Sequence, residues 1–160
     1  MHRKDKEIAD RSEIIGILTE AKYITLAMCA GNEPYLVALN HGYDKHKKCI
    51  YFHCAQKGRK VEILEKNSCV WGQAVVDKGY VAGACDHLYA SVHFSGKVTF
   101  VRDPAEKRRA LVTMIKTLEE KPEDVISEQV TENSVERVRI GRVDIMDVYG
   151  KKSEDVIVSL

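Results

Sequence analysis

The sequence contains none of the short patterns that mark the commonest nucleotide, zinc and membrane sites. No G-x-G-x-x-G or G-x-x-x-x-G-K stretch occurs, which excludes a phosphate site of the Rossmann or Walker kind. The 5 cysteines form no C-x-x-C pair, which argues against a zinc ribbon and a disulfide framework. No run approaches the roughly 18 apolar residues that a membrane helix needs.

The chain also has little net charge. Lys and Arg number 25 against 24 for Asp and Glu, a balance of +1. This balance gives no long-range attraction to polyanions, so we expect no nucleic-acid partner and only local basic sites. Residues 1–10 are charged and hold no apolar leader segment. We therefore expect a cytoplasmic protein with reduced thiols and no membrane partner.

What the sequence does contain fits one domain over residues 1–160. Hydrophobic residues make up 44% of the chain, which supplies a core and argues against disorder. Helical spacing and capping residues predict helices within 10–22 and 58–67 and a third that starts at Asp103-Pro104 and stops at Lys121-Pro122. Runs rich in β-branched and aromatic residues predict six strands, at 23–30, 34–43, 48–54, 69–76, 89–101 and 135–149.

These strands mostly follow one another rather than alternate with helices, which favours an antiparallel barrel or an α+β sheet. The first three are expected to form a meander, and Gly96 is expected to mark a bulge or a close backbone approach. Residues 77–88 show little periodicity and are interpreted as a long loop. Residues 122–134 are expected to form a short helix and a loop, and the basic run 107–109 a solvated helix face.

The segment IYFHCAQKGRK at residues 50–60 is the most informative one. An apolar strand leads into a polar turn, Gly58 permits a close approach, and Arg59 and Lys60 begin a helix. The free N–H groups at a helix start and the helix dipole favour an anion. The pattern therefore predicts a small phosphate cradle, with an ordinary solvated basic turn as the alternative.

Three segments together resemble a known family: IYFHCAQKGRK, PYLVALNHGYD at 34–44 and YASVHFSGKVTFVRDPAEKRRAL at 89–111. In this order, with Ala84-Cys85 between them and a closing Tyr149-Gly150-Lys151, they are similar to the pyridoxamine-phosphate-oxidase-related FMN-binding split barrels. The nitroimidazole-resistance branch is the most similar. The resemblance implies a mainly β fold, a six-stranded antiparallel Greek-key split barrel with flanking helices, and a homodimer with two FMN sites at its interface.

The resemblance also implies positions for the cofactor. Arg59 and Lys60 would hold the FMN phosphate, and the backbone of the strand at 34–43 would run along the flavin ring. The remaining positions implied to contact the flavin or line its pocket are Val37, Ala38, Leu39, Asn40, Tyr51, Phe52, His53, Tyr89 and Ser91.

His53 admits two interpretations. It is either a structural residue at a strand end or, as in the nitroimidazole-resistance branch, a group near the flavin that orients substrate or supplies a proton. Cys85 is interpreted as a structural residue in a loop that covers the flavin. The spacing of the histidines and cysteines predicts no metal site, and Trp71 is expected in the core or at an interface.

The leading hypothesis is an FMN-dependent oxidoreductase that reduces a small acceptor, either nitroaromatic or nitroimidazole-like or quinone-like. The alternatives are a flavin-binding or storage protein without turnover, and a haem-handling split barrel in which His41 or His53 ligates iron. A deazaflavin user is poorly separated from an FMN user. Pyridoxamine-phosphate oxidase activity itself is not expected, because that enzyme's C-terminal Trp-and-Arg pattern and its Arg-Gln pair before Val92 are missing.

Overall fold

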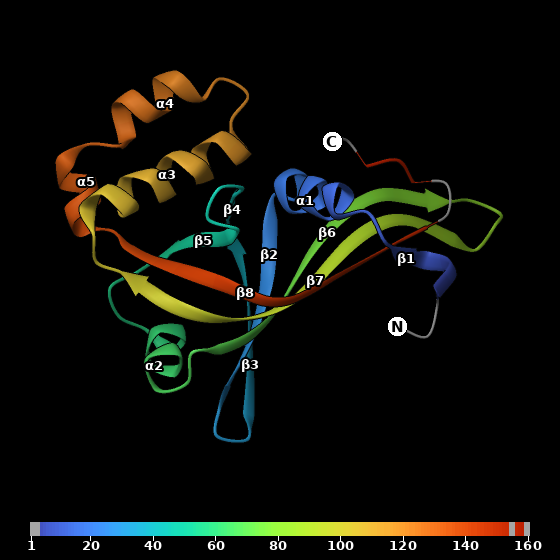
Figure 1. Cartoon of the computed structure of the whole chain (residues 1–160), viewed down its shortest axis with the longest axis horizontal. Helices are drawn as coiled ribbons and strands as arrows, with labels where there is room; N and C mark the ends of the chain where they lie inside the picture. The colour runs from blue at the N-terminus through green and yellow to red at the C-terminus, as the bar shows by residue number, and fades with distance from the viewer. Residues whose placement is uncertain (1–3, 154–155, 159–160) are drawn as a thin grey trace.

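The computed structural model describes residues 4–153 and 156–158 and shows one antiparallel sheet that curls into a barrel, with helices packed around it (Figure 1). The helices are η1 (Lys4–Lys6), a 3-10 helix, and α1 (Arg11–Glu20), α2 (Arg59–Lys66), α3 (Pro104–Leu118), α4 (Pro122–Gln129) and α5 (Glu132–Arg137). The strands are β1 (Glu7–Ile8), β2 (Tyr23–Ala30), β3 (Glu33–Asn40), β4 (Gly42–Asp44), β5 (Cys49–Cys54), β6 (Cys69–Val81), β7 (Asp86–Val101) and β8 (Arg139–Lys152).

The strand order is β3-β2-β6-β7-β8-β5-β4, and β1 pairs with β8. β3 and β4 lie at opposite ends of this order, yet His41 alone joins them in the chain, so the path of the chain closes the sheet on itself. The order β6-β7-β8-β5 is a Greek key, because the strand that precedes this meander returns beside its last member. The predicted mainly β split-barrel fold with flanking helices is confirmed. The sheet has 8 strands rather than six, because β1 and β4 are short.

The predicted meander of the first three strands is confirmed in its consecutive pairings but not as three continuous strands, because the middle strand is split in two. β2 and β3 form a hairpin, but β5 pairs with β4 and β8 and not with β3. The segment 34–43 was expected to be one strand, and it breaks at His41. The His41 ring is fully buried and its Nε2 lies 2.8 Å from the Leu18 carbonyl oxygen of α1. This contact holds the break between β3 and β4 against α1.

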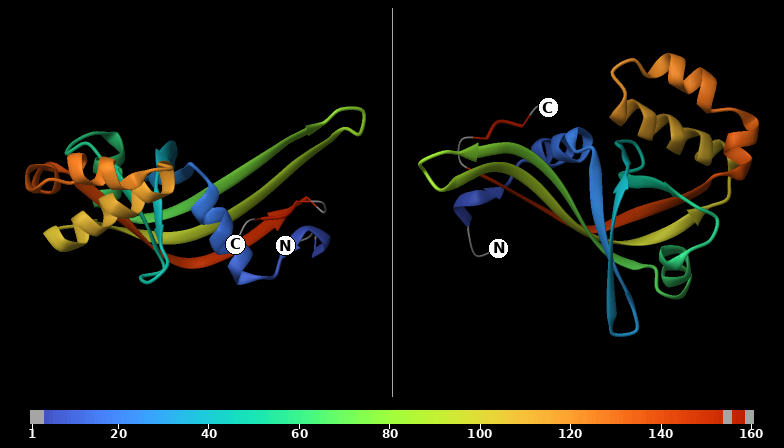
Figure 2. Two further views of the ribbon diagram at one scale, coloured as in Figure 1. Left: turned by 90° about the horizontal axis from the view of Figure 1, so that it is seen from above. Right: turned by 180° about the vertical axis from the view of Figure 1, so that it is seen from behind.

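The predicted loop at 77–88 is also wrong. β6 and β7 continue as a two-stranded ribbon to a turn at 82–85, with one register shift between Asp77 and Gly79. Figure 2 shows this ribbon projecting from the end of the molecule away from α3, α4 and α5. Glycine and acidic residues hide the period-2 pattern here, because a ribbon that projects from the sheet needs no buried face.

The C-terminal third differs from the prediction in its boundaries. Residues 122–137 form two helices, α4 and α5, and Val135 lies buried in α5 rather than in the last strand. The basic run 107–109 is not simply a solvated face. Lys107 Nζ donates to the Val138 carbonyl oxygen at 2.9 Å and Arg108 to that of Val130 at 2.8 Å. These two cations hold α4 and α5 against α3.

β5 is buried on both faces and separates two cores. Ile50 and Phe52 point into the main core inside the barrel, whereas Cys49 and Tyr51 point into a smaller core under α3. The alternation follows from the period of two of a strand. Gly141 lies beneath the Phe52 ring and leaves no room for a side chain, since a Cβ there would lie 2.2 Å from Phe52 Cζ.

The bulge predicted at Gly96 is confirmed. The β7–β8 register shifts between Ser95 and Gly96, and a Cβ at Gly96 would lie 2.6 Å from the Asp144 carbonyl oxygen. The bulge leaves Met146 on the opposite strand exposed.

Candidate functional site

The start of α2 is an open anion site. Gly58 is the N-cap residue with φ 137°, a conformation that favours glycine, and no side chain caps this end of the helix. The Val61 and Glu62 N–H groups both donate to the Gly58 carbonyl oxygen, which leaves the preceding N–H groups at Arg59 and Lys60. A helix start without a side-chain cap, followed at once by two cations, favours an anionic group.

A free strand edge lies beside this helix start. β3 is the terminal strand of the order and, within the described chain, pairs with β2 alone. The backbone N–H and C=O groups on its other edge therefore remain available to a ligand. The side chains alternate along the strand, with Leu36, Ala38 and Asn40 exposed and Val37 and Leu39 turned inward.

Contacts between α2 and β3 join the two features. Arg59 forms an ion pair with Glu33 and lies over the Tyr35 ring, 5.0 Å from its centroid. The positive charge of Lys60 lowers the pKa of Cys54, although burial outweighs this effect and raises it. We call Arg59, Lys60, Gly58 and the free edge of β3 the phosphate corner.

His53 lies beside a small apolar cavity rather than in the core. It is exposed at the end of β5, and with Asn40 it borders a cavity of about 260 Å³. The other walls come mainly from α3, through Leu111, Met114, Ile115 and Leu118. Asn40 is held in place because its Nδ2 donates to the Lys22 carbonyl oxygen at 3.0 Å.

Tyr51 and Phe52, which were predicted to line the flavin pocket with His53, could do so only through their backbone in this chain, and the prediction stays untested. Both side chains are fully buried, one in each core. Tyr51 Oη donates to Glu106 Oε1 at 2.8 Å, and burial raises the pKa of Tyr51. Only His53 of this predicted trio has a side chain on the surface.

Tyr89 and Ser91 do not join the phosphate corner within one chain. Ser91 pairs with Val75 and Lys151, and β7 stands three strands away from β3 in the order. At about 4.8 Å per strand this is about 14 Å across the sheet. Ser91 Oγ donates to the Lys151 carbonyl oxygen at 3.3 Å, and Lys151 Nζ lies 5.3 Å from the centroid of the Tyr89 ring.

An aromatic patch that was not predicted lies on the same outer face as Ser91. The His93 and Tyr149 rings stack with centroids 5.1 Å apart, and Trp71 meets Tyr149 edge-on at 6.5 Å. Trp71 is 54% exposed and Tyr149 40%. We call Trp71, Val75, His93 and Tyr149 the aromatic face. The sequence shows only that side chains alternate along each strand. Which residues of the three strands share a face depends on the register between the strands, which the sequence does not give.

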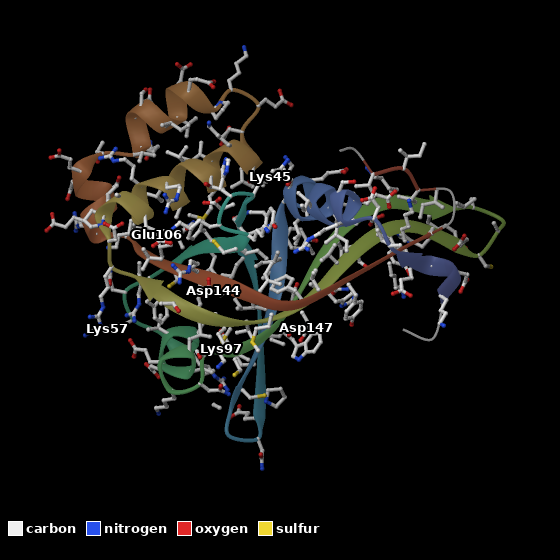
Figure 3. All side chains as sticks on the ribbon, viewed as in Figure 1. Lys45, Lys57, Lys97, Glu106, Asp144 and Asp147 are labelled. Atoms are coloured by element: carbon white, nitrogen blue, oxygen red, sulfur yellow. The ribbon has the colours of Figure 1, made fainter. Side chains whose placement is uncertain are left out.

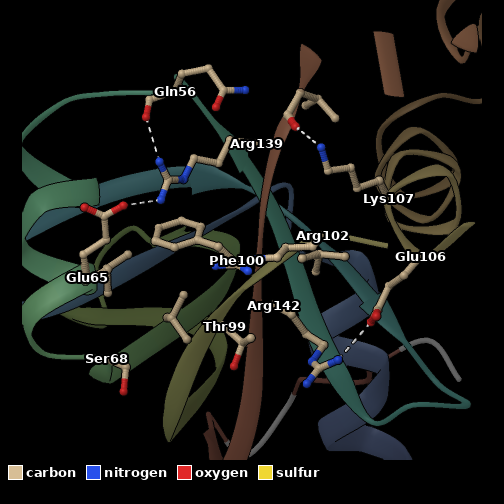
Figure 4. Close-up of a pocket in the computed structure, with 14 residues that line it drawn as sticks. Gln56, Glu65, Ser68, Thr99, Phe100, Arg102, Glu106, Lys107, Arg139 and Arg142 are labelled. Carbon is tan, nitrogen blue, oxygen red and sulfur yellow. Dashed lines mark hydrogen bonds and ion pairs between the residues drawn. The ribbon is translucent and has the colours of Figure 1, made fainter. Parts of the chain in front are cut away.

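The largest cavity described, about 870 Å³, lies between α2, α3 and the β7–β8 pair (Figure 4). Several cations line it, but most of them are already engaged. Arg139 donates to the Gln56 carbonyl oxygen at 2.8 Å and pairs with Glu65, and Arg142 donates to Glu106 at 3.0 Å. Figure 3 shows Glu106 beside α3 and Asp144 on β8, and Figure 4 shows the contact between Glu106 and Arg142. This cavity is held by structural ion pairs, so we place no ligand in it.

Two other residues that the sequence analysis considered, Cys85 and His41, lie outside the phosphate corner. Cys85 is exposed at the tip of the β6–β7 ribbon, so it covers no part of the same chain's corner. His41, a candidate haem ligand, is buried with its Nε2 bonded to Leu18. Within residues 4–153 and 156–158, no group of three or more His, Cys, Asp and Glu side chains could hold a metal ion. No helix of those residues is long and apolar enough to cross a membrane.

An antiparallel sheet that curls into a barrel without pairing its two end strands, with an uncapped cationic helix start beside the free edge of β3, defines a split-barrel protein with a candidate anion site. Residues 10–152 match the family model described as pyridoxamine 5'-phosphate oxidase. The chain therefore belongs to this family. A search of curated proteins finds no match.

Several solved structures share the fold. A candidate 5-nitroimidazole antibiotic resistance protein from Bacteroides thetaiotaomicron is 25% identical, with a TM-score of 0.77 over 91% of this chain and 86% of that one. The flavocytochrome Anf3 from Azotobacter vinelandii is 15% identical, with a TM-score of 0.78 over 96% of this chain and 72% of that one. An FAD and heme binding protein from Mycobacterium smegmatis is 13% identical, with a TM-score of 0.75 over 93% and 74%.

Proposed function

We propose that this chain is a cytoplasmic FMN-dependent oxidoreductase that reduces a small nitroaromatic, nitroimidazole-like or quinone-like acceptor. The observation that carries the proposal is the phosphate corner, where two cations begin an uncapped helix beside a free strand edge. Arg59 and Lys60 would hold the phosphate, and the backbone of Val37–Asn40 would hydrogen-bond the polar edge of the ring. A bound flavin supplies the electron transfer, while the chain supplies binding, orientation and access.

The phosphate corner suits a flavin because its backbone polar groups lack partners within the described chain. Its helix start has no side-chain cap and its strand has no outer partner in the described chain, so both present unpaired backbone groups. Polar backbone groups of this kind require partners when they are covered. A phosphorylated, flat, hydrogen-bonding ring system supplies both kinds of partner.

We further propose that two copies pair to complete the site. Tyr89 and Ser91 cannot reach the phosphate corner of their own chain, whereas a second copy seated on the aromatic face could bring its own corner to them. The aromatic face supports this pairing, because exposed Trp71 and Tyr149 are the residue types enriched in interfaces. The ligand would then lie in a groove between two barrels.

The cavity beside His53 is the site we assign to the acceptor. Its volume of about 260 Å³ equals that of about nine water molecules at ~30 Å³ each, which suits one small ring compound. The apolar wall of α3 would pack against the ring, and the His53 imidazole would donate a proton to an oxygen of the acceptor. An apolar pocket with few polar groups favours uncharged, planar molecules.

The phosphate corner can be tested with a pair of ligands. Arg59→Ala and Lys60→Ala should each weaken FMN binding about 10-fold to 100-fold, as expected for loss of a hydrogen bond to a charged group. Riboflavin has the same ring without the phosphate, so its affinity should hardly change. Fluorescence titration measures both affinities, and Lys66→Ala at the other end of α2 is the control. Equal losses for the two ligands, or purified protein that ignores FMN, would contradict the proposal.

The acceptor site can be tested by anaerobic reoxidation of the reduced flavoprotein with nitroimidazoles and quinones. His53→Ala should slow reoxidation and leave FMN bound. Ile115→Trp should fill the cavity, and it too should slow reoxidation while FMN stays bound. Lys116 is exposed on the same helix, so Lys116→Trp should leave the reoxidation rate unchanged. Reoxidation of the wild type no faster than that of free FMN would favour the flavin-storage alternative. A Soret band in the purified protein would favour haem.

A further inference from the structure

Two cysteines far apart in the sequence become neighbours across the β2–β6 seam. The register of this pair runs from Ile24 opposite Ala74 to Ala27 opposite Trp71. The pairing ends there, and a continuation of the same register by two residues would place Cys29 opposite Cys69. Side chains on directly opposite residues point to the same face of a sheet.

Two further observations support this placement. Both cysteines are exposed free thiols, and both line one cavity of about 390 Å³. Asn67 ties the two strands together at this level, because its Nδ2 donates to the Cys29 carbonyl oxygen at 3.4 Å and its Oδ1 accepts from the Cys69 N–H at 3.1 Å.

The spacing suits a covalent bond. Opposite residues of an antiparallel pair lie about 4.5 to 5.5 Å apart between their Cα atoms, and disulfides span about 4.4 to 6.8 Å. The other three cysteines lack such a partner. Cys49 is buried, and burial raises its pKa to about 11. Cys54 is half-buried on β5, and Cys85 stands at the tip of the β6–β7 ribbon.

We infer that Cys29 and Cys69 form a redox-active pair, a modification site at which a hydroperoxide converts two thiols into a reversible cross-strand disulfide. The first thiolate attacks a peroxide oxygen, the O–O bond breaks, and a sulfenic acid and one water form when the oxidant is hydrogen peroxide. The second thiol attacks the sulfenic sulfur, the S–S bond forms, and the second water leaves. The two thiols lose two electrons and two protons, which the peroxide takes up.

The pair lies next to the phosphate corner, since Cys29 also lines a cavity of about 450 Å³ that contains Arg59. The chemistry itself needs no flavin. Hydrogen peroxide is also small enough to enter a seam between two copies. The inference and the proposed function can therefore fail separately.

The test uses the full chain, first reduced and then treated with a small excess of hydrogen peroxide. After alkylation of the remaining thiols and tryptic digestion, mass spectrometry should show peptide 23–45 joined to peptide 67–78, each of which contains one cysteine. Alkylation should modify three of the 5 thiols, and dithiothreitol should restore the other two. Cys85→Ser is the matched control and should give the same crosslink.

Cys29→Ser and Cys69→Ser should abolish the crosslink and leave the remaining thiol of the pair as a single oxidised cysteine. A second measurement avoids any variant: reduced wild-type protein should bind phenylarsine oxide, which bridges two close thiols, and oxidation should abolish this binding. Separate oxidation of Cys29 and Cys69 in the wild type without a crosslink would overturn the inference. So would crosslinks that join different chains.

Discussion

His41 shows how one side chain couples the chain's path to its stability. It joins β3 to β4, its ring is fully buried, and within the described residues its Nδ1 has no hydrogen-bond partner. Burial lowers the pKa of His41, more than the hydrogen bond to Leu18 raises it. The folded protein therefore keeps this imidazole neutral at a pH where the unfolded chain binds a proton.

The sign of the pH dependence follows from this difference. Stability should be complete above the ordinary histidine pKa of 6.5 and should fall as the pH decreases below it, by up to about 1.4 kcal/mol per pH unit. The pKa of His93 is lowered too, mainly by burial, so it adds to the same slope. Thermal unfolding between pH 8 and pH 5 measures the effect. His41→Gln should reduce the slope, and an unchanged slope would contradict this role.

Adding one methyl group at Gly141 tests how tightly the main core is packed around the Phe52 ring. Gly141→Ala would place a Cβ 2.2 Å from Phe52 Cζ, so the ring or the strand must shift. We expect a loss of about 1 to 3 kcal/mol in the free energy of unfolding, measured by chemical denaturation. Thr99→Ala, at an exposed site on β7, should cost much less. Phe52→Leu should cost less in the Gly141→Ala background than in the wild type, and equal costs would show that the ring is not the obstacle.

At the scale of elements, one carboxylate connects a helix to two strands. Glu106 of α3 accepts hydrogen bonds from Tyr51 of β5 at 2.8 Å and from Arg142 of β8 at 3.0 Å. Burial by itself would raise the pKa of Glu106, but these two donors outweigh it and lower the pKa. The packing of α3 on the sheet, and with it one wall of the cavity beside His53, depends on this ionised group.

Glu106→Ala should destabilise the protein by about 2 to 3 kcal/mol, because it removes the carboxylate that accepts from the Tyr51 hydroxyl and from Arg142 Nη1. The contribution of Glu106 should be present above the ordinary pKa of 4.5 and should vanish as the pH falls below it. Denaturation curves at pH 7 and pH 4 measure both effects. Glu123→Ala, exposed on α4, is the control, and a similar loss there would refute the role of the network.

At the scale of the whole molecule, the proposed pairing of two copies explains why the predicted cofactor residues fall into two groups. Arg59, Lys60 and Val37–Asn40 belong to the phosphate corner, whereas Tyr89 and Ser91 lie three strands away. The aromatic face between them has no cover in the described chain. Burial of exposed apolar surface contributes about 25 cal/mol per Å², which favours association of two such faces.

Trp71→Glu should convert a dimer into a monomer and weaken FMN binding at the same time, because it replaces the most exposed ring of the aromatic face with a charge. Light scattering after size-exclusion chromatography measures the mass, and fluorescence measures the flavin affinity. Ile157→Glu, at a side chain that is 88% exposed, should change neither. A monomeric wild type that binds FMN normally would contradict the pairing.

The local patterns of the sequence determined most of the elements and the chemistry of the corner. The helix predicted at Asp103-Pro104 begins there, the helix predicted within 10–22 has Asp10 as its N-cap, and Gly58-Arg59-Lys60 begins α2. These features depend on residues close together in the chain, where capping, helical period and charge act without tertiary context. The fold class and the family resemblance also came from the order of such segments.

Only the tertiary structure decided which strands are neighbours and which side chains share a surface. The middle strand of the predicted meander is split at the buried His41, and its two halves pair at opposite ends of the sheet. The loop at 77–88 was wrong because a projecting ribbon buries no apolar face. Tyr51 and His53 are two positions apart on the same strand, yet the Tyr51 side chain is buried and hydrogen-bonded to Glu106, whereas the His53 side chain is exposed. Burial and register arise from contacts between distant residues, so no local pattern contains them.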